Sequence, residues 1–166
     1  MTHLPLRRIA VPLLFVLIAA PAFAQAGSKA APPDISGSWK FKTDVLPNKG
    51  CVISGNITFT RLPAANAYSC SFVSREDCNR ANDKTFTEVK QSCTVALEKG
   101  QFKIDSKVDA IVDAGPPDFK SYMLETKSYT ADSFVVSPNK KGELIGLFHS
   151  IRQCAVKFWR TVDLVS

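Results

Sequence analysis

Apolar and polar residues alternate along most of this chain of 166 residues, and a period of two is the spacing of strands. Near the start, Trp39 and Phe41 alternate with Lys40 and Lys42, the pattern of a strand with one buried face. No stretch of the sequence keeps the apolar spacing of an amphipathic helix over three turns. The sequence therefore predicts an all-β fold.

The expected strands are short and are separated by turn residues. They occupy 37–42, 51–59, 68–72, 89–97 and 102–108, followed by less regular stretches at 121–128, 133–137, 143–150 and 155–164. Turns at 47–50 and 98–100, a polar connection at 79–84 and a Gly-Pro-Pro break at 115–117 lie between them. Such spacing is typical of a sandwich or a barrel, and sequential hairpins favour a single antiparallel up-and-down β-barrel of eight or nine strands.

The first 24 residues have the pattern of a secretory signal peptide. Arg7 and Arg8 precede an apolar run at 9–20, and Pro21-Ala22-Phe23-Ala24 has the form of a cleavage site. The run is shorter than the roughly 20 residues of a spanning helix, so no permanent membrane anchor is expected. We predict a signal peptide at 1–24, a flexible lead-in at 25–34 and a β-barrel domain at 35–166, in a periplasmic or secreted protein.

The net charge argues against nucleic acid as a partner. The chain has 21 Lys and Arg residues against 15 Asp and Glu residues. The predicted signal peptide contains two of the arginines and no acid, so 19 basic residues remain against 15 acidic ones. Because this small excess is spread along the chain, it lacks the dense basic cluster of a nucleic-acid-binding surface.

All five cysteines lie in the predicted exported part of the chain. In an antiparallel hairpin, the numbers of opposed residues add to a constant that the turn sets. A turn at 64–65 places Cys51 opposite Cys78, and a turn near 81–82 places Cys70 opposite Cys93. The sequence therefore predicts the disulfides Cys51–Cys78 and Cys70–Cys93, both stabilising, with Cys154 as a free thiol that is either buried or links two chains.

No motif in the sequence indicates catalysis or a bound cofactor. The His-Glu-x-x-His, Gly-x-Ser-x-Gly and phosphate-loop patterns are absent. Ser137 and Lys140 match Ser-x-x-Lys, but in a turn without the helix that presents such a nucleophile. His149 is the only histidine outside the predicted signal peptide, which makes a zinc site unexpected. We predict no catalytic residue, no metal site and no cofactor.

Gly37-Ser38-Trp39 opens the first expected strand, and Arg160 lies in the last one. In this respect the chain resembles the calycin superfamily of lipocalin-like barrels, which have Gly-x-Trp in the first strand and a cation from the last strand over the Trp. The resemblance implies that Arg160, or alternatively Arg152, packs on Trp39. The other interpretation is that Gly37 marks a turn and Trp39 is an ordinary core residue. The whole chain is also similar to small exported proteins of proteobacteria, a similarity that implies no activity.

Two functions fit an exported barrel without catalytic motifs, since eight strands enclose either packed side chains or one small ligand. The first is a non-catalytic envelope protein that binds a small apolar or amphipathic ligand inside the barrel. The second is an inhibitor or surface-binding partner of another exported protein, such as a protease. The chain resembles small secreted protease inhibitors that are Gly-x-Trp barrels, and this resemblance implies that the lead-in at 25–34 would enter the cleft of the protease. The residues expected to line a ligand site are Phe41, Ile57, Phe59, Phe72, Ile104 and Phe148.

Overall fold

The computed structural model describes residues 33–47, 49–64, 66–80 and 83–161. The predicted signal peptide at 1–24 and residues 25–32 of the predicted lead-in lie outside the described residues. Among the residues that are described, no helix is long and apolar enough to cross a membrane.

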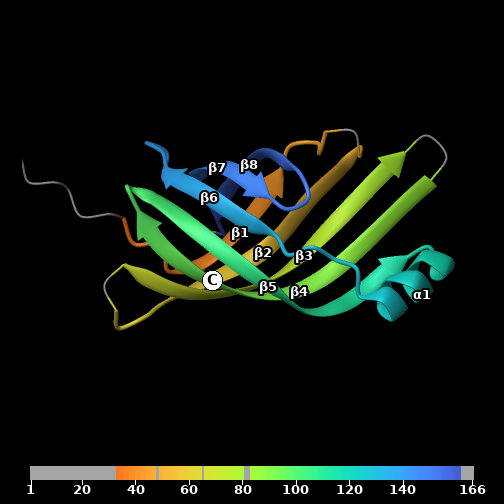
Figure 1. The fold of residues 1–166 in the computed structure, drawn as a ribbon. Helices are drawn as coiled ribbons and strands as arrows, with labels where there is room; N and C mark the ends of the chain where they lie inside the picture. The colour runs from red at the N-terminus through yellow and green to blue at the C-terminus, as the bar shows by residue number, and fades with distance from the viewer. Residues whose placement is uncertain (1–32, 48, 65, 81–82, 162–166) are drawn as a thin grey trace, which may run out of the picture. The chain divides into compact units, whose positions relative to one another are not determined.

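The strands of the described chain form a closed antiparallel barrel in which each strand pairs with its neighbours in sequence (Figure 1). β1 pairs with β8 and so closes the barrel. The strands are β1 (Gly37–Thr43), β2 (Cys51–Arg61), β3 (Ala67–Arg80), β4 (Asp83–Glu98), β5 (Gln101–Gly115), β6 (Ser133–Pro138), β7 (Leu144–His149) and β8 (Gln153–Arg160). The predicted up-and-down barrel is confirmed, with eight strands in the described residues.

The register of the first hairpins places the cysteines as the turn positions predict. Cys51 lies opposite Cys78 on β2 and β3, and Cys70 lies opposite Cys93 on β3 and β4. Both opposed pairs form disulfides, at sequence separations of 27 and 23 residues. Cys154 is a free thiol.

One predicted strand is a helix, so the prediction for 121–128 was wrong. The structure has α1 (Pro117–Thr126) at this place, and the helix ends at Lys127 in the left-handed conformation. Proline is well tolerated at Pro117 because the N–H groups of a first helical turn have no partner within the helix. The negative charge of Asp118, in the same turn, interacts favourably with the positive end of the helix dipole. Met123 is the buried residue of the helix. With so narrow a buried face, α1 lacks the apolar period that reveals a helix in sequence.

The long strands β3, β4 and β5 give the barrel an extended end. They have 14, 16 and 15 residues and run toward α1, which packs against β5 (Figure 1). The polar segment at 79–84 is therefore mostly strand, a correction to the predicted connection, because β3 continues to Arg80 and β4 begins at Asp83. β6 pairs with β5 only over Phe102–Ile104. The rest of β5 thus continues beyond the closed part of the sheet.

Aromatic side chains fill the middle of the barrel. Five phenylalanines make ring contacts with centroid distances of 5.2 to 6.1 Å, and none is more than 3% exposed. Each comes from a different strand: Phe41 from β1, Phe72 from β3, Phe134 from β6, Phe148 from β7 and Phe158 from β8. Most of these contacts are edge-to-face, and such ring pairs add to the free energy of apolar burial. The central lumen is therefore occupied by the protein's own side chains.

Trp39 and Arg160 close one end of the barrel. The Arg160 guanidinium lies 4.6 Å from the centre of the Trp39 ring. It also donates hydrogen bonds to the carbonyl oxygens of Ser36 and Asp34, at 2.8 and 2.9 Å. The Trp39 indole N–H donates to the carbonyl of Ile35 at 2.9 Å. One cation and one indole thus hold the segment before β1 across the end of the barrel.

Gly37 is required at this closed end for two reasons. Its φ is +103°, which side-chain-bearing residues rarely adopt, and a Cβ would lie 3.3 Å from Nη1 of Arg160. Gly37 is exposed at the start of β1, although the alternation predicts an inner position. Arg152, the alternative partner of Trp39, lines a cavity elsewhere in the barrel.

Candidate functional site

A cavity of about 290 Å³ lies where the extended strands meet α1 and the connections at 127–132 and 150–152. Strand β2 contributes its first residues, β3 its last and β4 its first, so these antiparallel strands meet the cavity at the same end of the barrel. Trp39 pairs with Ile57, further along β2, so the closed end is the other one. The apolar and aromatic part of the wall consists of Leu46, Ile53, Phe119, Tyr122, Met123, Phe148 and Ile151.

The inner faces of β3 and β4 become polar on approaching the cavity. Along β3 the inner positions change from Phe72 to Ser74 and Glu76, and along β4 they include Thr87 and Thr85. The polar residues keep the inward direction of the strand because side chains alternate with a period of two. Polar groups facing into a barrel are costly unless they have partners or line accessible space. Here they do both.

Asp132 is the centre of a buried hydrogen-bond network at the cavity wall and is 0% exposed. Its Oδ2 accepts hydrogen bonds from Ser74 Oγ at 2.8 Å and Gln91 Nε2 at 2.6 Å. The Tyr129 hydroxyl lies 3.2 Å from both carboxylate oxygens and donates to them. The Asp132 backbone N–H donates to Gln91 Oε1 at 2.9 Å. This network ties the connection between α1 and β6 to β3 and β4.

Burial gives this network unusual proton affinities. Burial, with a smaller contribution from the negative charge of Glu76, raises the pKa of Asp132 to about 6, although the hydrogen bonds from Ser74, Gln91 and Tyr129 act in the opposite direction. Burial, with the negative charge of Asp132, also raises the pKa of the Tyr129 hydroxyl above its usual range. Asp132 is therefore mostly ionised at pH 7, and Tyr129 stays neutral as a donor.

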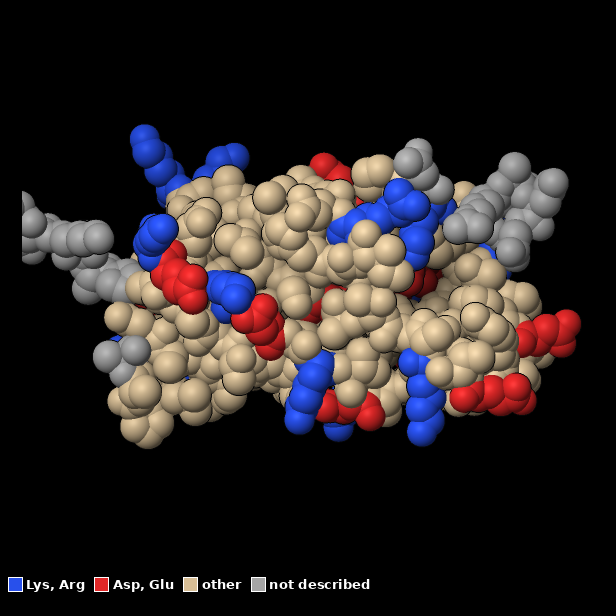
Figure 2. All heavy atoms as spheres, in the orientation of Figure 1, with Lys and Arg blue, Asp and Glu red and all other residues tan. Residues whose placement is uncertain are grey.

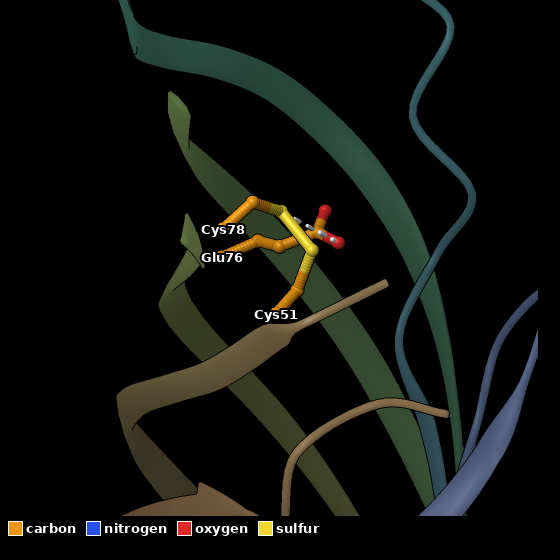
Figure 3. A group of neighbouring side chains, drawn as sticks. All are labelled: Cys51, Glu76 and Cys78. Carbon is orange, nitrogen blue, oxygen red and sulfur yellow. Dashed lines mark hydrogen bonds between the residues drawn. A yellow bond between two sulfur atoms is a disulfide. The ribbon is translucent and has the colours of Figure 1, made fainter. Parts of the chain in front are cut away.

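Glu76 is the second acid of the cavity, and it lies beside the Cys51–Cys78 disulfide (Figure 3). Its Oε1 is 3.8 Å from Lys49 Nζ and 3.7 Å from Cys78 Sγ. The sulfur has no proton to donate because it is part of the disulfide. The two sulfurs and the Glu76 carboxylate lie within 4.8 Å of one another, the spacing of metal ligands. The disulfide, however, leaves neither cysteine as a thiolate, the form that binds metals.

The charged groups of the cavity are ordered by depth. Asp132 is fully buried and the Glu76 side chain is 15% exposed, whereas the Lys49 side chain is 30% exposed and Arg152 is exposed. The cavity is therefore acidic at its buried end and basic at its rim. On the outer face seen in Figure 2, basic and acidic side chains are instead interspersed.

The residues predicted to line a ligand site divide into two groups. Phe148 lines the cavity. The other five lie in the packed core, each at most 3% exposed, and are not part of the cavity wall: Phe41, Ile57, Phe59, Phe72 and Ile104. The physical reason is that aromatic rings at the inner positions of eight strands fill the lumen, so space is left only where the inner residues are polar.

The free thiol of Cys154 and His149, the histidine of the described residues, lie apart from this wall. Cys154 pairs with Phe148 in the sheet, and burial raises the pKa of its thiol, which keeps it protonated at neutral pH. His149 Nδ1 lies 2.9 Å from Gln153 Nε2 at the end of β7.

Sequence reasoning missed Glu76, Thr85, Thr87 and Asp132. The signal for the first three was present, because extending the alternation of β3 beyond Phe72 and of β4 before Val89 places them inward. Comparison with known protein families, curated proteins and solved structures found no match.

Proposed function

We propose that this protein binds a small amphipathic ligand in the cavity at the extended end of the barrel. The observation that supports this proposal is the cavity itself, with one wall of aromatic and aliphatic residues and another of polar inner residues from β3 and β4. Its volume of about 290 Å³ is near the lower bound for small-molecule sites. The ligand would therefore be small and would leave the packed centre of the barrel undisturbed.

The proposed setting is an exported protein without catalytic activity. Two disulfides in the described residues suit an oxidising compartment, as does the signal-like pattern at 1–24. The cavity contains hydrogen-bonded acids, hydroxyls and a disulfide, and this arrangement supports binding and orientation of a ligand.

Native mass spectrometry of the protein purified from its own exported fraction tests this proposal. We expect an added mass that dissociates on denaturation. Thr85→Phe should abolish it by filling the cavity, whereas Thr94→Phe, the same change at an exposed position of β4, should retain it. An added mass that persists in Thr85→Phe, or none in the unaltered protein, would contradict the proposal.

A further inference from the structure

We infer that the cavity selects ligands that have a carboxylate attached to an aromatic or aliphatic body, and that Arg152 holds the carboxylate at the rim. This inference rests on the proposed ligand-binding function and specifies the chemical class of the ligand. It follows from which cation of the rim has no partner, which charge lies deep in the cavity, and what covers the buried wall.

Arg152 is the group at the rim that would contact an anion. It lies in the connection between β7 and β8, where it is exposed and lines the cavity. The other arginines whose side chains are described each contact a carboxylate, a carbonyl or an aromatic ring: Arg61, Arg75 and Arg160. Within the part of the chain that the structure describes, the Arg152 guanidinium has no such contact. Its donors are therefore free for a ligand.

A guanidinium at this position discriminates between the head groups that a ligand can have. It offers N–H donors in one plane and no acceptor, and two of these donors match the two oxygens of a carboxylate. An amide or an alcohol has a single oxygen to accept from Arg152, and that oxygen has no charge. A guanidinium is also weakly hydrated, so a carboxylate displaces its water at low cost.

Asp132 sets the direction in which such a ligand enters. This carboxylate is 0% exposed in the buried part of the wall, and solvent screens charges poorly there. A second anion beside Asp132 would be repelled, whereas at the exposed rim the anion contacts the cation of Arg152. The carboxylate of the ligand is therefore favoured at the rim, and the rest of the ligand points inward.

The buried wall favours an apolar body on the inward part of the ligand. The aliphatic and aromatic residues that line the cavity and are at most 5% exposed are Leu46, Ile53, Met123 and Phe148. Ile151, next to Arg152, is 68% exposed at the rim. A phenyl ring or an alkyl chain that enters the cavity leaves water and contacts this wall, which favours binding in proportion to the apolar area removed from water.

Three probes with the same phenyl ring and the same chain of three methylene groups test the inference: phenylbutyrate, phenylbutyramide and phenylbutanol. Isothermal titration calorimetry at pH 7.5 should give the tightest binding for the acid and weaker binding for the amide and the alcohol. Arg152→Gln should weaken phenylbutyrate binding about tenfold, the effect of one charged hydrogen bond, and leave phenylbutyramide binding unchanged.

Two further variants separate a specific effect from damage to the fold. Arg61→Gln is the matched control, since Arg61 is exposed at the other end of β2, pairs with Asp34 and does not line the cavity. It should leave the binding of all three probes unchanged. Arg152→Glu should reverse the preference of the unaltered protein, so that phenylbutylamine binds more tightly than phenylbutyrate. Misfolding cannot produce such a gain.

The outcomes distinguish this inference from the proposed function. If the amide or the alcohol binds as tightly as the acid, the cavity binds ligands but does not select carboxylates, and the inference fails alone. An equal loss for phenylbutyrate and phenylbutyramide in Arg152→Gln, or an unchanged preference in Arg152→Glu, would also overturn it. If no probe binds, the inference fails, and if the purified protein also has no added mass, the proposed function fails with it.

Discussion

Replacing Asp132 by Asn should remove a pH dependence of stability that this residue gives to the protein. The side chains have the same shape, and the hydrogen bonds of the site can be kept. The Asn Oδ1 can accept from Ser74 and Gln91, which contact Oδ2 of the carboxylate. The Asn Nδ2 can donate to the Tyr129 hydroxyl, which then acts as acceptor. The variant therefore isolates the effect of the buried charge.

The magnitude follows from the raised pKa of Asp132. In the folded protein this pKa is about 6, against 3.8 for an unperturbed aspartate. Between these values the folded state keeps a proton that the unfolded state has released, so the free energy of unfolding decreases as pH rises. Over the whole window the decrease is about 3 kcal/mol, at 1.36 kcal/mol for each pKa unit. The amide of the Asp132→Asn variant does not titrate, so its free energy of unfolding shows no such decrease. Between pH 4 and pH 7 the free energy of unfolding of the variant should therefore rise by this amount relative to that of the unaltered protein.

Equilibrium urea unfolding of both proteins at several values from pH 4 to pH 7.5, with the disulfides intact, measures this difference. Asp113→Asn is the control, because hydrogen bonding to Lys120 lowers the pKa of Asp113. For that residue the sign is opposite: the stability it contributes is present above pH 4 and is lost as pH falls. A difference between the Asp132→Asn variant and the unaltered protein that stays constant over the pH range would refute the argument.

Three other predictions concern stability and can be measured by the same urea unfolding. Replacing both cysteines of either disulfide by Ser should cost about 3.5 kcal/mol, the loop-closure entropy of sequence separations of 27 and 23 residues. Because these separations are similar, a much larger cost for one bridge would show that the loop-entropy argument fails. Arg160→Met should cost about 1–3 kcal/mol through the lost contact with Trp39 and the lost hydrogen bonds to Asp34 and Ser36, whereas Arg152→Met should cost little. Gly37→Ala should destabilise more than Gly142→Ala, because both have positive φ but only the Cβ at 37 would meet Arg160, and equal costs would contradict this explanation.

The barrel and its disulfides were predictable because the information is local. Alternation identifies the inner face of each strand, and the turn positions set which residues lie opposite each other. Cys51 and Cys78 therefore follow from counting, as do Cys70 and Cys93. Tertiary contacts were not needed to pair them.

The helix and the cavity were not predictable in the same way. Met123 alone of α1 is buried, so the helix leaves almost no apolar period in the sequence. Asp132 belongs to no strand or helix, and its partners Ser74 and Gln91 are 58 and 41 residues away in sequence. The inward direction of Glu76 follows from extending the alternation of β3 beyond Phe72, but its polar side chain alone gives no sign of burial.

The contacts that hold the barrel together are largely separate from those proposed to bind a ligand. Trp39 and Arg160 close one end, the phenylalanine cluster fills the middle, and Glu76 and Asp132 lie at the other end. Sites that share no contacts have nearly additive effects on free energy. Arg160→Met should therefore lower stability without changing ligand affinity, whereas Thr85→Phe should abolish ligand binding. Asp132 is the exception, because its network anchors the connection after α1 and its charge also faces the cavity, so pH should affect stability and ligand binding through the same carboxylate.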